Sequence, residues 1–251
     1  MTNGLSSMGD VINQMPKISP SVAQENTAEP KYNCPACKDT GDILRRDEYG
    51  RLVCKPCLLC NIHKKRRIKL LLDKAELPYH TMDVPPQPPT LEYLKNFDAN
   101  KPMWILFAGK AGSGKTTEAA WLAYQLVCKK FARTRFFYAF DLTRRLQATI
   151  RKPQEHSEII DTIADVDLVI VDDFFKGAPN PNSFHYAEYM EACYEIIWTR
   201  YDVRKPLIIT SQLTIPDFMR IDSALSSRIL EMCKNYTITY RTDAKNWRIN
   251  A

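Results

Sequence analysis

The amino-acid sequence predicts an α/β fold: a five-stranded parallel sheet flanked by helices and preceded by a small zinc-binding module. Three observations support this prediction. From about residue 91 onward, short apolar runs alternate with helical patterns, as in parallel sheets with crossover helices. A glycine-rich loop at residues 109–116 directly follows one of the apolar runs. Two Cys-x-x-Cys pairs stand earlier in the chain, at a spacing typical of tetrahedral zinc sites.

The bulk composition is that of a soluble globular protein. The chain has 251 residues, of which 45% are hydrophobic, so it can bury one sizeable core and a small appendage. No apolar stretch approaches the ~20 residues of a membrane span, and the polar N-terminus lacks the pattern of a secretory signal. We therefore expect an intracellular protein with no membrane partner, whose eight cysteines are reduced. The net charge of +6 favours acidic partners but does not by itself indicate nucleic acid.

The composition divides the chain into four segments. Residues 1–33 are rich in Ser, Asn, Gln and Pro, and we interpret them as a flexible N-terminal arm. Residues 34–77 contain the cysteine pairs, a basic run and a helical pattern at Ile68–Ala75, and they form the predicted zinc-binding module. Five prolines predict an extended linker over residues 78–90. The sheet domain then occupies residues 91–251.

The elements of the sheet domain follow from the apolar patterns and the residues beside them. The apolar runs predict strands at Met103–Ala108, Arg135–Phe140, Asp167–Asp172, Pro206–Ser211 and Tyr236–Arg241. The stretches between them, each opening near a residue able to cap a helix, predict helices at Lys115–Phe131, Asp141–Ile150, Ser183–Arg200 and Ser223–Cys233. Five strands are enough for a nucleotide-binding sheet.

The glycine-rich loop has the sequence of a phosphate-binding loop. It reads Gly-Lys-Ala-Gly-Ser-Gly-Lys-Thr between a strand and a helix, so that backbone N–H groups would point at phosphates. Lys115 would meet the outer phosphate oxygens, and the Thr116 hydroxyl would ligate Mg²⁺. A glycine-rich turn without a ligand has no need of Lys and Thr at these positions. We therefore predict that ATP or GTP binds to Gly109, Lys110, Ala111, Gly112, Ser113, Gly114, Lys115, Thr116 and Thr117.

A second motif lies at the end of a later strand. Leu168–Asp173 is an apolar run that ends in two carboxylates. At the strand tip, Asp172 can hold Mg²⁺ while Asp173 orients or deprotonates the attacking water. The alternative is an ordinary strand end with two solvated aspartates. Many ATPases with this motif carry Glu at the second position, and the shorter Asp predicts slow hydrolysis.

Another strand, within Lys205–Gln212, also ends in polar side chains. A hydroxyl or amide at such a tip can contact the terminal phosphate or its water, and so sense whether that phosphate is present. Thr210 and Gln212 are the candidates for this role. The alternative is that they only form a polar strand end, which is common.

The cysteine pairs predict a structural zinc site. We favour Cys34, Cys37, Cys54 and Cys57 as ligands, with Cys60 as the alternate. Because two more donors follow at once, the third and fourth ligands remain open among Cys54, Cys57, Cys60 and His63. A module of some thirty residues has too small a core to fold alone, so the metal would supply most of its folding free energy. The alternative is a set of reduced cysteines without a metal.

The order of the motifs resembles the AAA+ ATPases of the bacterial replicative helicase loaders, of the DnaC/DnaI type, and their transposition relative IstB. The resemblance covers about residues 91–251 and implies the AAA+ fold. It is carried by the phosphate loop, the Val-Asp-Asp strand, Arg200-Tyr201 before Lys205-Pro206, Ile209–Gln212 and Leu225–Arg228. Gln212 departs from the pattern, since these loaders usually have Asn there.

The resemblance also implies roles for two arginines. In that family an arginine of the last motif completes the nucleotide site of the adjacent subunit, and this role falls on Arg228. It implies self-assembly through Arg228, because a guanidinium would stabilise charge on the transferred phosphoryl group. The alternative is a salt bridge on a helix surface. Asn246–Arg248 is similar to the aromatic-Arg end of these proteins, which implies a place for Arg248 near the nucleotide.

The resemblance extends to the N-terminal module and to nucleic acid. The string Cys34–Gly41 is similar to the zinc-bearing domain of some loaders, which implies docking on the replicative hexameric DNA helicase. In loaders, the helix after the second strand lies near single-stranded DNA. The basic candidates for phosphate contacts are Arg144, Arg145, Arg151 and Lys152, together with the run Lys64–Lys69. The alternative is that these charges only solvate a helix face.

The resemblance therefore predicts an ATP-dependent loader that delivers the replicative helicase onto single-stranded DNA. It would act in the cytoplasm of a bacterial cell, encoded by the chromosome or by a phage. The alternatives are an IstB-like transposition helper ATPase and a zinc-dependent adaptor with little turnover. A small-molecule kinase fits poorly, because no arginine-rich lid follows the Asp pair.

Overall fold

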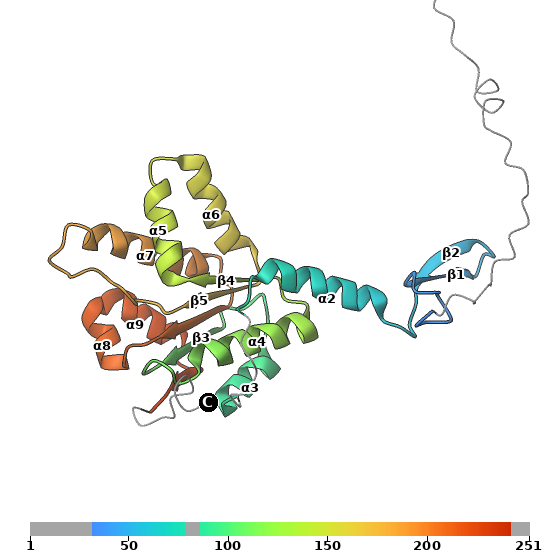
Figure 1. Cartoon of the computed structure of the whole chain (residues 1–251), viewed down its shortest axis with the longest axis horizontal. Coiled ribbons are helices and arrows are strands. Elements are labelled where there is room, and N and C mark those ends of the chain that lie inside the picture. The colour runs from blue at the N-terminus through green and yellow to red at the C-terminus, as the bar shows by residue number, and fades with distance from the viewer. Residues whose placement is uncertain (1–31, 79–85, 242–251) are drawn as a thin grey trace, which may run out of the picture. The chain divides into compact units, whose positions relative to one another are not determined.

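The computed structural model describes residues 32–78 and 86–241. The chain divides into two compact units at the junction of Cys60 and Asn61, and each is described by itself (Figure 1). The predicted arm lies outside the described residues, apart from its last two residues. Residues 79–85 of the predicted linker and Asn246–Arg248 also lie outside them.

The smaller unit is built on an antiparallel hairpin. β1 (Asp42–Arg46) pairs with β2 (Leu52–Pro56) in a register that sets Asp42 opposite Pro56. Gly50, in the connecting turn, has φ +74°, a left-handed conformation that favours glycine. Beyond the paired strands, the Cys57 N–H donates to the Gly41 carbonyl oxygen at 2.7 Å. The hairpin therefore brings the segments before β1 and after β2 side by side.

The larger unit contains a five-stranded sheet. Its strands are β3 (Trp104–Ala108), β4 (Thr134–Tyr138), β5 (Leu168–Asp172), β6 (Leu207–Ser211) and β7 (Thr237–Thr239). They lie in the order β4-β5-β6-β3-β7, and every neighbouring pair is parallel. The five-stranded parallel sheet predicted from the sequence is confirmed.

Eight helices accompany this sheet within the described residues. They are α2 (Ile62–Ala75), α3 (Pro88–Asn96), α4 (Lys115–Lys130), α5 (Ala139–Thr149), α6 (Pro153–Asp165), α7 (Tyr186–Asp202), α8 (Ile215–Ile221) and α9 (Ser223–Met232). α2 contacts β4, at the edge of the sheet, and α4 (Figure 1). None of the helices in this part of the chain combines the length and apolar character needed to cross a membrane.

Side chains of the strands point alternately into two apolar cores. On β3, Trp104 and Leu106 belong to one core, whereas Ile105 and Phe107 belong to the other. The first core includes side chains of α5, α6, α7, α8 and α9, and the second includes those of α3 and α4. β3, β5 and β6 are buried along their whole length, as expected for parallel strands covered on both faces.

The structure differs from the predicted elements chiefly at prolines. Pro88 and Pro89 open α3, although they were assigned to the extended linker. α6 and α8, which were not predicted, likewise carry proline in their first turn. In that turn a proline removes no intrahelical hydrogen bond. A proline in the sequence can therefore mark the start of a helix as well as its end. In addition, α5 begins at Ala139, so Phe140 lies in a helix and not in the preceding strand.

A buried arginine on α7 connects that helix with three other elements. The Arg200 side chain, on α7, donates hydrogen bonds to four carbonyl oxygens, at the end of α6 and just before β5 and β6. It is fully buried, and this burial lowers its pKa to about 10. These bonds fix the amino ends of β5 and β6 relative to α7.

Candidate functional site

The glycine-rich loop joins β3 to α4 and has a backbone that requires glycine. Gly109, Gly112 and Gly114 have φ values of +134°, +80° and +96°. A Cβ atom at Gly109 would lie 2.8 Å from the carbonyl oxygen of Tyr240, so a side chain does not fit there. α4 begins at Lys115, and its first N–H groups therefore face the loop. The loop presents backbone donors suited to an anion.

The lysine of the loop is folded onto it. Lys115 Nζ donates to the Lys110 carbonyl oxygen at 2.8 Å and lies 3.4 Å from Ser113 Oγ. The Lys115 side chain is buried beside the loop. Its ammonium group can donate hydrogen bonds to phosphate oxygens bound in the loop.

Asp172, at the end of β5, lies beside the first turn of α4. Its Oδ1 atom accepts hydrogen bonds from Thr116 Oγ1 at 2.8 Å and from Thr210 Oγ1 at 2.6 Å. The carboxylate is buried, and this burial raises its pKa although the two hydroxyl donors lower it. A hydroxyl and a carboxylate that share one position form the oxygen donor set that Mg²⁺ prefers. The residues predicted for magnesium, Thr116 and Asp172, therefore fit that ion.

Asp173 is held by the neighbouring strand. Its backbone has φ +56°, in the left-handed region that Asp tolerates better than most residues. The Asp173 N–H donates to Thr210 Oγ1 at 2.9 Å, and Gln212 Nε2 donates to Asp173 Oδ1 at 2.9 Å. The structure thus brings both predicted candidates, Thr210 on β6 and Gln212 just after it, to the Asp pair. Lys176, which sequence reasoning missed, lies 2.6 Å from Asp173 Oδ2; its spacing of three residues was the only signal.

Arg228 lies on α9 and stacks on α7. Its guanidinium carbon is 4.8 Å from the centre of the Trp198 ring and 4.6 Å from that of Tyr201. These are cation–π contacts, which differ from the helix-surface salt bridge considered as the alternative. Within its own chain the arginine therefore rests on aromatic rings.

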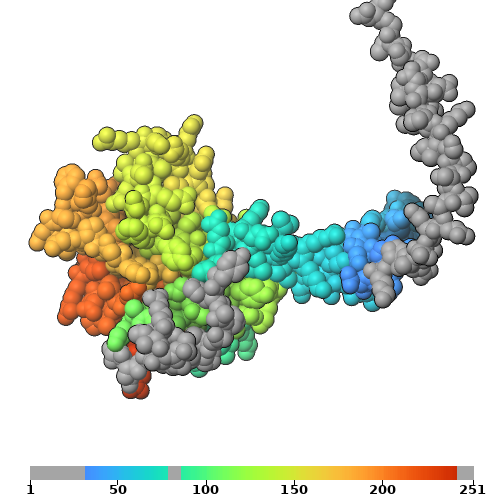
Figure 2. All heavy atoms as spheres, in the orientation of Figure 1, coloured from blue at the N-terminus to red at the C-terminus, as the bar shows by residue number. Residues whose placement is uncertain are grey.

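Arg144 and Arg145 are exposed on α5. The Arg144 guanidinium carbon lies 5.5 Å from the centre of the Phe140 ring, and that ring is 48% exposed. In Figure 2 the atoms of α5 and α6, in yellow-green to yellow, form a projecting part of the larger unit's surface. An exposed aromatic ring therefore stands beside an exposed cation on this helix.

The other predicted phosphate contacts lie elsewhere. Arg151 and Lys152 do not continue α5, because that helix ends at Thr149; Lys152 immediately precedes α6 and forms an ion pair with Glu155 at 3.0 Å. The run Lys64–Lys69 lies on α2. From this run, Lys64 and Arg67 approach the ring of Phe131, at distances of 5.9 Å and 4.8 Å from its centre.

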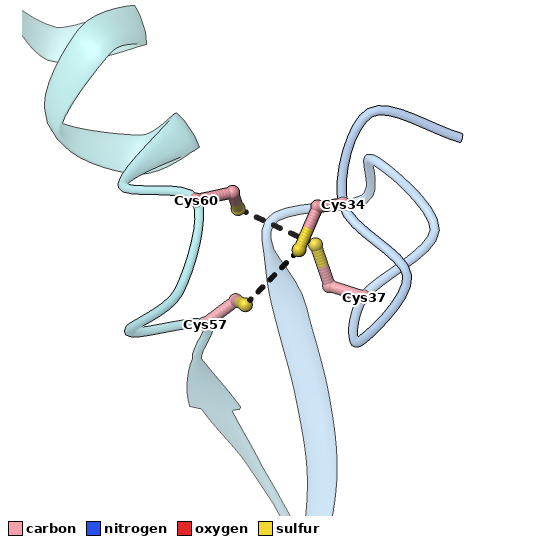
Figure 3. A group of neighbouring side chains, drawn as sticks. All are labelled: Cys34, Cys37, Cys57 and Cys60. Carbon is pink, nitrogen blue, oxygen red and sulfur yellow. Dashed lines mark hydrogen bonds between the residues drawn. The ribbon is translucent and has the colours of Figure 1, made fainter. Parts of the chain in front are cut away.

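Four thiols gather in the smaller unit (Figure 3). Cys34 and Cys37 precede β1, whereas Cys57 and Cys60 follow β2, and the four sulfur atoms lie within 4.8 Å of one another. The Cys34–Cys57 and Cys37–Cys60 sulfur distances are 3.7 Å and 3.4 Å. Sulfurs bound tetrahedrally to zinc stand about 3.8 Å apart, so this cluster fits zinc. The backbone N–H of Cys60 is the main cause that lowers the pKa of the Cys57 thiol to about 7, which favours the thiolate that zinc binds.

The structure corrects one predicted ligand. Cys54 is exposed within β2, opposite Leu44, and Cys60 takes its place in the cluster. A residue paired inside the hairpin cannot turn toward Cys34, whereas residues beyond the end of β2 can. The sequence contains two overlapping Cys-x-x-Cys pairs, and the end of the strand decides between them. His63 lies on α2, in the larger unit.

Comparison with known proteins gives a family for the larger unit. The family model described as IstB-like ATP binding protein matches residues 89–247. The uncharacterized protein YqaM of Bacillus subtilis (strain 168) is 30% identical over 159 residues, which are 61% of this chain and 49% of YqaM. The chain therefore spans about half the length of that relative. The phage-like element PBSX protein XkdC of the same organism is 26% identical over 229 residues, which are 83% of this chain and 82% of XkdC.

Two solved structures are among those similar to this chain. The crystal structure of the DnaC helicase loader covers 69% of this chain and 99% of its own, at 20% identity and a TM-score of 0.49. The crystal structure of DnaI covers 72% of this chain and 93% of its own, at 18% identity and a TM-score of 0.47.

Proposed function

Because the chain belongs to the family of IstB-like ATP-binding proteins, we propose that it is an ATPase that delivers the replicative hexameric DNA helicase onto single-stranded DNA. The ATPase part is carried by one observation: the Thr116 hydroxyl and the buried Asp172 carboxylate meet at 2.8 Å beside the loop lysine. The loader part rests on the cysteine cluster that precedes this domain and on the resemblance of the motifs. The proposed place of action is the cytoplasm of a bacterial cell.

The residues of the loop and of the strand ends have separate roles in the proposed reaction. The backbone N–H groups of the loop and Lys115 bind the phosphate oxygens. Thr116 and Asp172 would hold Mg²⁺, which neutralises charge on the transferred phosphoryl group when it is bound. Asp173 orients the attacking water. Lys176 pairs with the Asp173 carboxylate, so it competes with the attacking water for the same oxygen atom, which favours slow turnover by the isolated chain.

Arg228 supplies the proposed link between turnover and assembly. We assign it to the nucleotide site of an adjacent copy, where its charge would stabilise the transition state. We propose that it leaves the rings of Trp198 and Tyr201 when copies assemble. Replacement of Arg228 by alanine should therefore lower phosphate release by the assembled protein and leave the affinity for ATP unchanged. Equal phosphate release by the variant and the wild type would contradict this role.

Two exposed surfaces support the proposed partners. On α5, Phe140 can stack on a base while Arg144 neutralises a phosphate, a combination used for single-stranded nucleic acid. In the smaller unit, Leu58 and Leu59 are 82% and 76% exposed between the last two cysteines of the cluster. Exposed apolar side chains on so small a unit suit docking on another protein.

Phosphate release tests the ATPase part. The wild type should release phosphate from ATP faster when single-stranded DNA is present, and Lys115→Ala should show no release above background. Lys129→Ala is the matched control, because it removes a lysine from the opposite end of the same helix and should match the wild type. Equal rates for Lys115→Ala and the wild type would leave only the adaptor without turnover.

Capture of a purified hexameric helicase tests the loader part. With ATP present, the wild type should retain the helicase, whereas the double variant Leu58→Ser/Leu59→Ser should lose it and keep its zinc content. The zinc measurement separates loss of the docking surface from loss of the unit's fold. Failure of the wild type to bind the helicase would overturn the loader assignment.

A second candidate function is favoured by the family description itself. An IstB-like protein that serves transposition would act with a transposase on duplex DNA, through the same ATPase core. The two functions differ in the DNA that stimulates phosphate release and in the protein that is retained. Stimulation by duplex DNA but not by single strands, together with retention of a transposase, would replace the loader by the transposition helper.

A further inference from the structure

Glu118 is a buried carboxylate that the proposed chemistry does not use. It is 1% exposed, on α4 near the phosphate loop. Its Oε1 atom accepts the backbone N–H of Gln87, at 2.6 Å, and the hydroxyl of Thr90; its Oε2 atom accepts the hydroxyl of Tyr240. All three donors are neutral. Burial of a carboxylate is unfavourable unless its oxygens accept hydrogen bonds. The three hydrogen bonds therefore fix the position of the Glu118 side chain.

These hydrogen bonds join segments that are distant in the sequence. Gln87 and Thr90 stand at the start of α3, and Tyr240 follows β7. The Tyr240 N–H donates to the Ala108 carbonyl oxygen at 2.9 Å, next to Gly109. The tyrosine therefore spans from the first residue of the phosphate loop to Glu118 on the helix that follows it.

The place of this network relative to a nucleotide follows from the order of the strands. The residues proposed to act on the terminal phosphate, Asp172 and Asp173 with Thr210, belong to β5 and β6 or follow them directly. β3, which leads into the loop, lies between β6 and β7. If the terminal phosphate of a bound nucleotide points toward β6, its nucleoside end extends in the opposite direction, toward β7 and the start of α3. Glu118 and its three partners lie on that side.

We propose that Glu118 is a positioning residue for the nucleoside part of the bound nucleotide. It holds Tyr240 and the start of α3 together as one wall beside the phosphate loop. The inference rests on the proposed binding of ATP at the loop. In it, the wall strengthens ATP binding through contacts with the base and the sugar. Loss of the wall should therefore weaken ATP binding without weakening the binding of phosphates alone.

Calorimetric titration of the full, zinc-loaded chain with two ligands tests this proposal. The ligands are ATP and inorganic tripolyphosphate, each with Mg²⁺, since the second has no nucleoside. For Glu118→Leu, we expect the affinity for ATP to fall about tenfold or more and the affinity for tripolyphosphate to stay within about twofold. Tyr240→Phe removes one hydroxyl and should show a smaller loss for ATP alone. Glu118→Gln keeps an acceptor oxygen for Gln87 and Thr90 and should retain most of the affinity.

Glu92→Gln is the control, because it changes an exposed glutamate on α3. If Glu118→Leu does not fold, Tyr240→Phe still decides. Unchanged ATP affinity in folded Glu118→Leu, or in Tyr240→Phe where Glu118→Leu does not fold, would overturn the proposal. An equal loss for both ligands would also overturn it, because it would indicate a general effect on the loop. A wild type that binds tripolyphosphate as tightly as ATP would refute the nucleoside wall alone, whereas a wild type that binds neither ligand would refute the proposed function as well.

Discussion

The two units of this chain differ in what stabilises the fold of each. In the described part of the smaller unit, the buried apolar side chains are cysteines, with Ile43 packed against them. The larger unit buries aliphatic and aromatic side chains on both faces of its sheet. The proposed zinc would therefore supply most of the stability of the smaller unit, whereas the larger unit depends on the hydrophobic effect.

This contrast separates the two halves of the proposed function. Docking on the helicase is assigned to the unit that depends on metal, and ATP chemistry to the unit that does not. Metal removal should thus abolish docking on the helicase and leave ATP hydrolysis intact. Destabilising substitutions in the apolar core should leave the structure of the cysteine cluster unchanged. The predictions below test that separation, from the largest expected effect to the smallest.

Zinc removal should have the largest effect. Structural zinc sites of this kind contribute on the order of 10 kcal/mol or more to folding. A chelator added to the full chain should therefore give fast amide hydrogen exchange over residues 34–60 and leave the exchange of β3 and β5 unchanged. Mass spectrometry of the exchanged peptides measures both regions at once. Continued protection of the cysteine segment without metal would show that the smaller unit has another source of stability.

Two serine variants sharpen the assignment of the ligands. Cys60→Ser should lose zinc, or bind it far more weakly, because it removes one of the four gathered thiols. Cys54→Ser is the matched control, since its side chain is exposed on the hairpin, and it should keep one zinc per chain. Zinc content by atomic absorption distinguishes them. The reverse result would restore the ligand set favoured from the sequence.

Replacement of Arg200 should give the largest loss in the larger unit. Arg200→Met would remove the arginine donor from four carbonyl oxygens in buried or partly buried hydrogen bonds, at roughly 1 kcal/mol each. We expect the free energy of unfolding to fall by about 3–5 kcal/mol in urea titrations followed by tryptophan fluorescence. Lys95→Met, on the exposed face of α3, should change it little. A loss below about 1 kcal/mol would mean that water replaces the guanidinium.

Replacement of Asp172 should raise the stability of the fold, whereas replacement of Arg200 lowers it. Burial raises the pKa of this carboxyl above its ordinary value of 3.8, so the folded chain holds the proton more tightly than the unfolded chain. Its contribution to stability is therefore present below that ordinary value and is lost as the pH rises through the raised pKa. Asp172→Asn keeps the oxygen that accepts from Thr116 and Thr210 and avoids this loss.

Without nucleotide, Asp172→Asn should therefore be more stable than the wild type at pH 7, by about 1.4 kcal/mol for each unit of the pKa shift. Below pH 4 the difference should shrink. Thermal unfolding at several pH values measures it. With Mg²⁺ and ATP the order should reverse, because the variant lacks the carboxylate proposed to hold the ion. A variant less stable than the wild type at every pH would contradict the effect of burial.

The sequence predicts what depends on local pattern. The five strands and the phosphate loop were predictable because apolar runs and a fixed spacing of glycines are visible within short windows. The choice between Cys54 and Cys60 was not, since both complete a Cys-x-x-Cys pair and only the end of β2 separates them. Likewise, Pro88 could open a helix or lie in a linker, and the packing of α3 on the core decides.

The sequence also does not predict contacts between segments that are distant along the chain. Nothing in the local sequence indicates that Glu118 accepts from Thr90 and from Tyr240, which lie 28 and 122 residues away. The same holds for Thr210, whose hydroxyl connects Asp172 with the backbone of Asp173. The sequence could place Thr210 at a strand tip, but its partners depend on which strand lies beside it.

The smallest expected effect on stability belongs to Arg228. Its contacts with Trp198 and Tyr201 are partly exposed, and cation–π pairs at such sites contribute about 0.5–1 kcal/mol. Arg228→Ala should therefore lower the free energy of unfolding by no more than about 1 kcal/mol, far less than Arg200→Met. The same variant should change the fluorescence of Trp198, measured in a chain whose other tryptophans are replaced by phenylalanine. If addition of ATP analogue to the wild type produces the same change, the arginine leaves the rings as copies assemble. If the signal of the wild type stays constant through assembly, Arg228 remains on the two rings of α7, and the proposed link between assembly and hydrolysis must come from another residue.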